Sequence, residues 1–176
     1  MFSILEMFKI GVGPSSSHTV GPMVAACKFV ESLEHTGTLG RVSRVRTVLY
    51  GSLALTGLGH GTDRATVAGL EGNMPQTVDT DHVNIIRHEC ESSGELLLAG
   101  KHRIDFDYAH DVVMDVWHRL AAHPNGMRFQ AFDQQNNLVD EQVWYSIGGG
   151  FVRKGAPEDP MIGIHERPPE GASFAD

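Results

Sequence analysis

A short polar stretch that leads straight into an apolar helix pattern constrains this chain most. Residues 11–21 read Gly-Val-Gly-Pro-Ser-Ser-Ser-His-Thr-Val-Gly. Apolar side chains then recur every three or four residues, which predicts a helix from about Gly21 to His35. Pro22 has no N–H to donate, so it fits only in the first turn of this helix. We place the N-cap at His18 or Thr19, and Thr19 has the better side chain for it.

The polar stretch itself predicts a binding loop. The side chains available to a ligand are Ser15, Ser16, Ser17, His18 and Thr19. Free N–H groups and the positive end of the helix dipole meet at such a position, and both favour a carboxylate or another anion. An ordinary capped turn is the alternative, although this run of polar residues exceeds what one cap needs. A phosphate loop of the GxxxxGK type is excluded because no Gly-Lys-Ser/Thr follows the glycines.

The bulk properties exclude several classes of protein. The length of 176 residues fits one domain, or one domain with tails. The net charge of −8 argues against a nucleic-acid-binding surface. No apolar run approaches the ~18 residues of a membrane span, and the N-terminus does not resemble a signal peptide. The two cysteines, Cys27 and Cys90, indicate no disulfide framework, so we expect a cytoplasmic protein.

A second glycine-rich segment repeats the design of the first. Residues 42–55 read as a strand, and residues 56–63 then read Thr-Gly-Leu-Gly-His-Gly-Thr-Asp, which predicts a loop. Thr62 is a suitable N-cap for a helix over residues 63–71. His60 lies between two glycines in this loop, just before a helix N-terminus. Two loops that each contain one histidine are therefore expected.

The remaining patterns predict an α+β fold with a mostly antiparallel sheet and helices packed mainly on one face. We expect the folded domain to end at residue 153, and residues 154–176 to be a linker or tail, because proline, glycine and acidic residues follow without a period. The other expected elements are a short helix over 3–9, a helix over 79–91, extended chain over 96–106, a helix over 110–122, a turn at 123–126, and a hairpin of strands 127–132 and 138–147 ended by three glycines.

Five blocks of sequence resemble a known family, the iron–sulfur L-serine dehydratases, in the same order. They are Phe8–Met23, Tyr50–Gly57, Gly59–Asp63, Asn125–Met127 and Tyr145–Phe151. The resemblance is to one half of these enzymes, the β domain or β subunit. It implies a fold similar to the alternative-substrate-binding, regulatory domain of some phosphoglycerate dehydrogenases.

The resemblance also implies a cofactor and partners. In this family a separate α domain carries a 4Fe-4S cluster, which needs about three or four cysteine thiolates. Two distant cysteines do not suffice, so the chain is expected to be one subunit, or the N-terminal portion, of a larger enzyme. The expected partners are L-serine, the cluster-bearing α domain and further copies of the chain. No pyridoxal phosphate is expected, because no motif for an aldimine-forming lysine is found.

The implied reaction converts L-serine to pyruvate and ammonia, and it needs a base for the α-proton. His60 is our candidate for this base, and Asp63 would orient it or cap the helix; alternatively, His60 is only a loop residue at the domain interface. Leu58 departs from the family, which often has lysine there, so position 58 is left out of the site.

Two roles are open for the first loop. Ser15–Thr19, together with Thr62, would hold serine in the shared active site or bind serine or an anion at a regulatory site. Asn125, Gly126, Gly148, Gly149 and Gly150 would line the interface with the α domain, although the triple glycine also suits a strand end with positive φ. The competing class is a small-molecule-binding module with no chemistry of its own.

Overall fold

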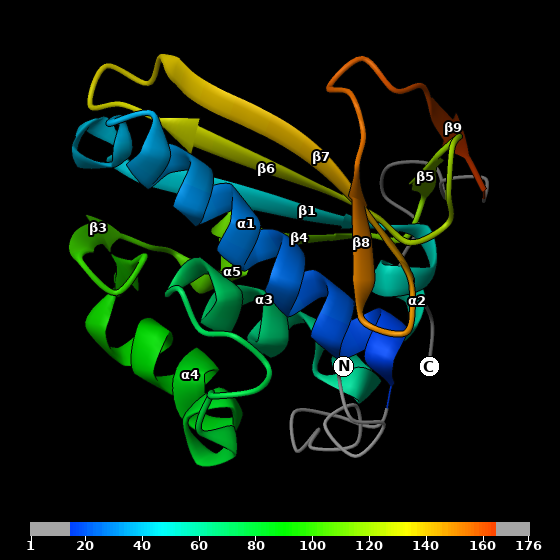
Figure 1. Cartoon of the computed structure of the whole chain (residues 1–176), viewed down its shortest axis with the longest axis horizontal. Coiled ribbons are helices and arrows are strands. Elements are labelled where there is room, and N and C mark those ends of the chain that lie inside the picture. The colour runs from blue at the N-terminus through cyan, green and yellow to red at the C-terminus, as the bar shows by residue number, and fades with distance from the viewer. Residues whose placement is uncertain (1–14, 165–176) are drawn as a thin grey trace, which may run out of the picture.

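Five strands form the central sheet of the computed structural model, which describes residues 15–164 (Figure 1). Their order is β4-β1-β6-β7-β8, and all neighbours are antiparallel except the parallel pair of β1 and β4. The bounds are Arg44–Tyr50 for β1, Val112–Asp115 for β4, Gly126–Phe132 for β6, Leu138–Gly148 for β7 and Phe151–Lys154 for β8. The predicted hairpin of residues 127–147 is thereby confirmed.

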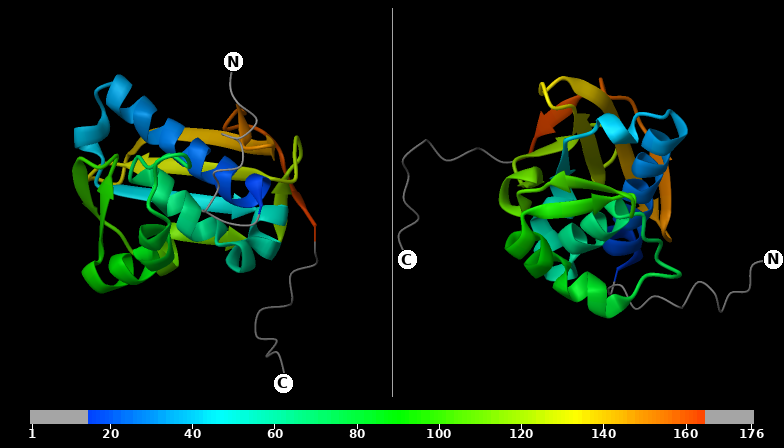
Figure 2. Two further views of the ribbon diagram at one scale, coloured as in Figure 1. Left: turned by 60° about the horizontal axis from the view of Figure 1, so that its bottom comes forward. Right: turned by 90° about the vertical axis from the view of Figure 1, so that its left-hand side faces the viewer.

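Helices cover one face of this sheet (Figure 2). The main core lies between the sheet, α1 and α3, and the rings of Phe29 and Phe129 stack there with their centroids 5.3 Å apart. The α+β class and the mostly antiparallel sheet are confirmed. The helices are α1 Gly21–His35, α2 Gly51–His60, α3 Thr62–Leu70, α4 Thr80–Ser93 and α5 Tyr108–Asp111, with the short turns η2 Ser16–Val20 and η3 Leu39–Arg41.

Two small ribbons complete the described part of the chain. Strands β2 Glu95–Leu98 and β3 His102–Asp105 form a hairpin in the stretch that was expected to be extended. Strand β5 His118–Leu120 pairs with β9 Met161–Gly163. The start of the expected linker therefore returns to the fold as a strand, and the domain boundary itself stays a prediction. The expected helix over residues 3–9 lies outside the described residues.

The predicted helix over residues 110–122 is wrong. The segment holds one turn of helix, then β4 and β5. Thr47 in β1 pairs with Val112, and the backbone hydrogen bonds of this parallel ladder override a weak helical period. Asp115 then accepts hydrogen bonds from the N–H groups of Trp117 and His118, which turns the chain at the end of β4.

The predicted strand over residues 42–55 is too long, and the loop after it is largely helical. The chain turns at Gly51, where φ is +53° and a Cβ would lie 2.9 Å from the carbonyl oxygen of Pro124. Helix α2 then continues to His60, and Gly61, with φ of +73°, links it to α3. Thr62 is the first residue of α3 and not its cap, since Gly61 holds that position.

The first polar loop is also partly helical. Residues Ser16–Val20 form η2, a π-helical turn that continues into α1, so neither His18 nor Thr19 is an N-cap. The Thr19 hydroxyl is buried and donates to the carbonyl oxygen of Ser15. Turns of this kind are rare and occur often at functional sites. None of the helices in the described part of the chain is both long and apolar enough to cross a membrane.

Candidate functional site

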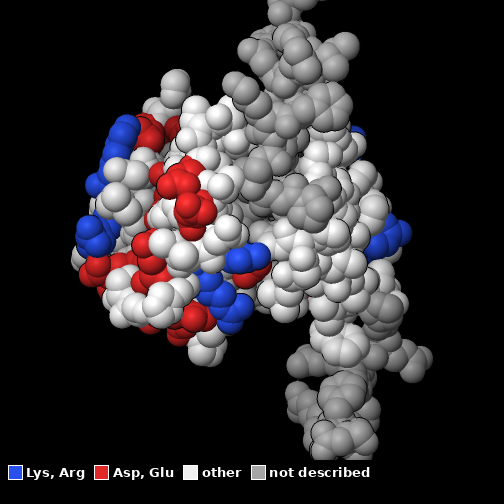
Figure 3. Space-filling model, turned by 90° about the horizontal axis from the view of Figure 1, so that it is seen from below, with Lys and Arg blue, Asp and Glu red and all other residues white. Residues whose placement is uncertain are grey.

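Four segments without charged side chains meet at one end of the sheet. They are residues 15–27, 47–62, 120–127 and 142–152, and none of them contains Lys, Arg, Asp or Glu. They include η2, the start of α2, the turn before β6 and the end of β7. Figure 3 shows charged residues gathered on the left half of the lower face, whereas the described atoms on the right half are mostly uncharged. We call the surface of these four segments the uncharged end of the sheet; Arg64 and Arg119 lie at its border, beside Gly61 and Gly51.

The two histidines predicted from the sequence lie side by side in this region. His18 belongs to η2, and His60 is the last residue of α2. Their ring centroids are 5.2 Å apart, with 46° between the ring planes. Helix α2 and the π-helical turn thus bring two segments 42 positions apart into one site.

Both ring nitrogens of His18 are hydrogen-bonded to hydroxyl groups. Nδ1 lies 2.8 Å from the Ser17 Oγ, and Nε2 lies 3.0 Å from the Ser52 Oγ. The Ser15 hydroxyl is 3.2 Å from that of Ser17 and extends this cluster. Burial, and secondarily the neighbouring His60 ring, lower the pKa of His18. The His18 ring is therefore neutral near pH 7, with one nitrogen donating and the other accepting.

His60 has no hydrogen bond to any other described residue, and its Nδ1 is buried without a partner. Asp63, the expected orienting residue, does not supply one, because its carboxylate accepts a hydrogen bond of 2.9 Å from the Tyr108 hydroxyl. Asp63 instead lies in the first turn of α3, where its charge suits the helix dipole. The Thr62 hydroxyl is also buried without a partner. An imidazole nitrogen without a hydrogen-bond partner is a candidate to take a proton from a bound molecule.

The predicted interface residues are divided between surface and interior. Asn125 is half-buried and donates through Nδ2 to the carbonyl oxygen of Ser146. Gly126 is buried against Leu120, so it offers a partner little surface. Residues 148–150 form the turn between β7 and β8 with φ angles of 98°, 63° and 80°, which fits the strand-end interpretation of the triple glycine.

Two residues near the histidines were missed from the sequence. Ser52 contacts His18, and the Ser146 hydroxyl donates to the carbonyl oxygen of Ser17 at 2.7 Å. Their one signal was a position inside the blocks that carry the family resemblance, because an isolated serine has no distinctive pattern. Of the other expected residues, Ser16 is half-buried and its carbonyl accepts the N–H of Gly21.

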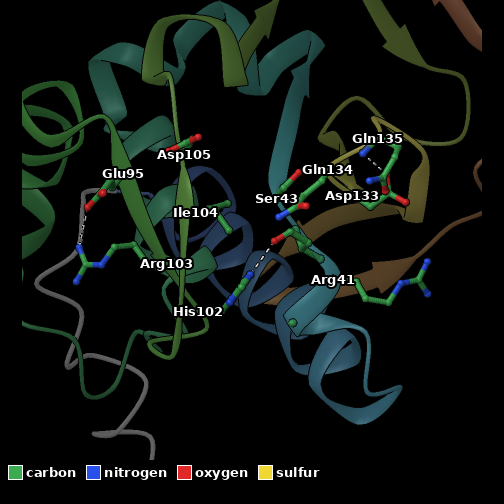
Figure 4. A pocket seen from close by; sticks show the side chains of 12 residues that line it. Arg41, Ser43, Glu95, His102, Arg103, Ile104, Asp105, Asp133, Gln134 and Gln135 are labelled. Carbon is green, nitrogen blue, oxygen red and sulfur yellow. Dashed lines mark hydrogen bonds and ion pairs between the residues drawn. The ribbon is translucent and has the colours of Figure 1, made fainter.

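Three open clefts in the described part of the chain lie away from the histidines. One of them is lined by Arg41, His102 and Asp133, at the end of β1 opposite to the histidine pair (Figure 4). Its His102 Nε2 lies 2.7 Å from the carbonyl oxygen of Val42. Nothing in this cleft links it to the histidine site. Within residues 15–164 no three His, Cys, Asp or Glu side chains are placed to bind a metal ion together.

The paired histidines, surrounded by hydroxyl groups at an uncharged end of the sheet, define a candidate site for proton transfer on a small polar molecule. Comparison with known proteins gives the family. The family model described as serine dehydratase beta chain matches residues 3–156, and the chain belongs to this family.

Curated relatives agree with this assignment. The chain is 47% identical over 151 residues to the L-serine dehydratase of Helicobacter pylori, and the match covers 86% of this chain and 32% of the relative. It is 46% identical over 150 residues to the L-serine dehydratase of Streptomyces coelicolor, and this match covers 85% of this chain and 33% of that relative. For L-serine dehydratase 1 of Escherichia coli the identity is 46% over 153 residues, covering 86% and 33%. The chain thus spans about one third of the length of the curated relatives it matches.

Proposed function

We propose that this chain is the β part of an iron–sulfur L-serine dehydratase, which converts L-serine to pyruvate and ammonia. The observation that carries the proposal is the contact between His18 and His60 on an uncharged end of the sheet. The relatives named L-serine dehydratase are about three times as long as the matched region, so a second part of such an enzyme has room for what this chain lacks.

The 4Fe-4S cluster implied by the family resemblance does not fit the residues of this chain. Cys27 lies on α1 and Cys90 on α4, and both thiols are buried. Burial raises the pKa of Cys27 to about 11 and that of Cys90 to about 12, which disfavours the thiolate form that binds iron. We therefore assign the cluster to a partner α domain.

The residues of this chain suit substrate binding and proton removal. His60 takes the α-proton of serine, because its ring is free of hydrogen bonds to the described residues. The hydroxyls of Ser15 and Ser17 hold the polar groups of the substrate beside it. The β-hydroxyl leaves as hydroxide and takes up a proton to become water, and the remaining enamine is hydrolysed to pyruvate and ammonia. We assign the task of assisting the departure of that hydroxyl to the partner α domain.

The uncharged end of the sheet is the face that we propose for docking the α domain. Large apolar side chains are exposed there without a described neighbour to cover them: Leu55 and Leu58 on α2, Ile147 at the end of β7, and Phe151 at the start of β8. The four segments themselves bring no charge that a partner would have to remove from water, which would be costly. We also propose that the complete enzyme is a homo-oligomer, as the resemblance implies.

Replacing His60 tests the base. With a cluster-bearing α domain of the family supplied, we expect His60→Asn to lower the rate of pyruvate formation by about 10²-fold or more. Folding and cluster content should stay unchanged. His110→Asn is the matched control, because His110 is an exposed histidine on α5, outside the site. Near-normal turnover of His60→Asn would rule out the assignment.

The second candidate function is a regulatory site, and the two hydrogen bonds that fix the His18 ring favour it. A ring that is hydrogen-bonded at both nitrogens is suited to fix a ligand-binding turn. If the Ser15–Thr19 turn is regulatory, His18→Ala removes activation by serine and leaves the limiting rate intact. A collapsed limiting rate would instead indicate a place in the active site.

A further inference from the structure

Hydrogen bonds and the backbone between neighbouring residues form a closed circuit around His18. The first half of this circuit runs from the π-helical turn to β7. The Nδ1 of His18 is bonded to the Ser17 hydroxyl, and the carbonyl oxygen of Ser17 accepts the Ser146 hydroxyl at 2.7 Å. Ser146 is in turn paired with Asn125, because its N–H donates to the Asn125 carbonyl at 3.0 Å and its own carbonyl accepts from Nδ2 at 3.2 Å.

The second half of this circuit returns to His18 through α2. Asn125 follows Pro124, whose carbonyl oxygen accepts the N–H of Ser52 at 3.3 Å. The Ser52 hydroxyl then meets the Nε2 of His18 at 3.0 Å. The turn before β6 thus connects the two serines that act on His18, one through the side chain and one through the backbone of η2.

Close packing makes the Ser146 contact specific. Ser146 has no exposed surface, and Gly21 lies against it. A Cβ on residue 21 would lie 2.0 Å from the Ser146 Oγ, so glycine leaves the room that the hydroxyl needs. A buried hydroxyl with one good acceptor cannot be removed without leaving the Ser17 carbonyl short of a partner.

We propose that Ser52 and Ser146 are positioning residues that fix the ring of His18 from two sides and hold one neutral tautomer beside His60. Ser52 acts directly on Nε2, and Ser146 acts through the backbone that carries His18. A ring held in this way has both nitrogens engaged by hydroxyl groups, so proton removal is left to His60. The catalytic meaning of this arrangement rests on the proposed function, but the arrangement itself belongs to this chain alone.

Nitrogen NMR of the imidazole rings tests the proposal on the whole 176-residue chain. Long-range proton–nitrogen spectra above the pKa of the ring distinguish the two neutral tautomers, and His18→Asn assigns the signal. We expect His18 to be one tautomer in the wild type. Ser52→Ala should change the tautomer ratio by about fivefold, as the loss of one net hydrogen bond to the ring predicts. Ser146→Ala should shift the His18 nitrogen signals, because its hydroxyl holds the backbone of Ser17.

Ser32→Ala is the matched control, since Ser32 is a half-buried serine on α1 whose hydroxyl meets Gln142 Nε2 at 3.1 Å away from the histidines. It should leave the His18 signal unchanged. Because Ser52 is only half-buried, Ser52→Ala keeps the test open if Ser146→Ala does not fold. An unchanged His18 tautomer in Ser52→Ala would overturn the proposal. If the tautomer shifts as expected but no α domain yields pyruvate, the proposed function fails and the positioning role stands.

Discussion

At the scale of single residues, two helix glycines differ in what a methyl group would meet. At Gly21 an added Cβ collides with the Ser146 hydroxyl, whereas at Gly59 no atom lies within 4 Å. We predict that Gly21→Ala lowers the free energy of unfolding by about 1–3 kcal/mol through overpacking. Gly59→Ala should be neutral or stabilising by up to about 1 kcal/mol, because alanine is the better helix former. Urea denaturation of both variants gives the comparison.

The same two variants also show whether close packing at Gly21 affects the position of the His18 ring. Gly21→Ala should also disturb the His18 signal in the NMR experiment described above, because the Ser146 hydroxyl must move away from Ser17. Gly59→Ala lies one residue before His60 and should leave the His18 signal as it is. Equal stability of the two variants would contradict the close fit between α1 and β7.

Part of the site was predictable at this scale and part was not. His18 and His60 stood out because each lies among glycines and hydroxyl residues next to a helix start. Ser52 and Ser146 did not, because their roles depend on partners far away in the sequence. Asp63 was expected to assist His60, yet it points to Tyr108, a choice that only tertiary packing decides.

At the scale of elements, His82 on α4 connects this helix to Glu71 at the end of α3. His82 Nε2 lies 2.6 Å from the Glu71 carboxylate, and its Nδ1 lies 3.4 Å from that of Glu89. The hydrogen bond to Glu71 raises the pKa of His82 above 6.5, against the effect of its partial burial. Burial raises the pKa of Glu71. Asp79, at the N-cap of α4, adds a further negative charge near this histidine.

Because of this contact, we expect the free energy of unfolding to fall as pH rises. A raised pKa means that the folded protein binds the His82 proton more tightly than the unfolded chain. The stabilisation is complete below the unfolded value of 6.5 and is lost as pH rises through the pKa in the folded state. The raised pKa of Glu71 acts in the same direction from its own unfolded value of 4.5 upward. We expect a contribution of about 0.5–1 kcal/mol for this partly exposed pair.

Comparison with His82→Gln isolates the effect. The unfolding free energy of both proteins should be measured from about pH 6 to about pH 9, where an ordinary histidine loses its proton. Other histidines titrate in both proteins, so the difference between the two curves reports on His82. We expect the difference to shrink as pH rises. A constant difference would contradict a protonated His82 as the stabilising form.

Elements with strong local signals were predicted well, and elements defined by their neighbours were not. Helix α1 and the β6–β7 hairpin follow the periodicity of their residues. Strand β4 was mistaken for helix because its pairing with β1 is parallel and distant in sequence. The boundary between β1 and α2 was missed because it depends on Gly51, whose positive φ lets the chain pass close to Pro124.

At the scale of the whole molecule, the distribution of charge separates two regions. Acidic and basic side chains gather over one part of the surface, and the four segments around the histidines carry none. Such a division has no bearing on the stability of the fold alone, because exposed charges contribute little. It does matter for a surface that is covered by another domain, where charges are depleted at the centre.

A single added charge on this face therefore tests the docking proposal. Leu58 on α2 is 63% exposed, and Ile85 on α4 is 48% exposed in the charged region. Leu58→Glu and Ile85→Glu should each change the unfolding free energy by about 0.5 kcal/mol or less, as substitutions at exposed sites usually do. With an α domain of the family supplied, we expect Leu58→Glu to weaken association about tenfold or more, because the carboxylate must lose its water on docking. Ile85→Glu should bind as the wild type does. Equal affinity of the two variants, measured by calorimetry, would place the docking surface elsewhere, while a loss confined to Leu58→Glu would locate it beside His60.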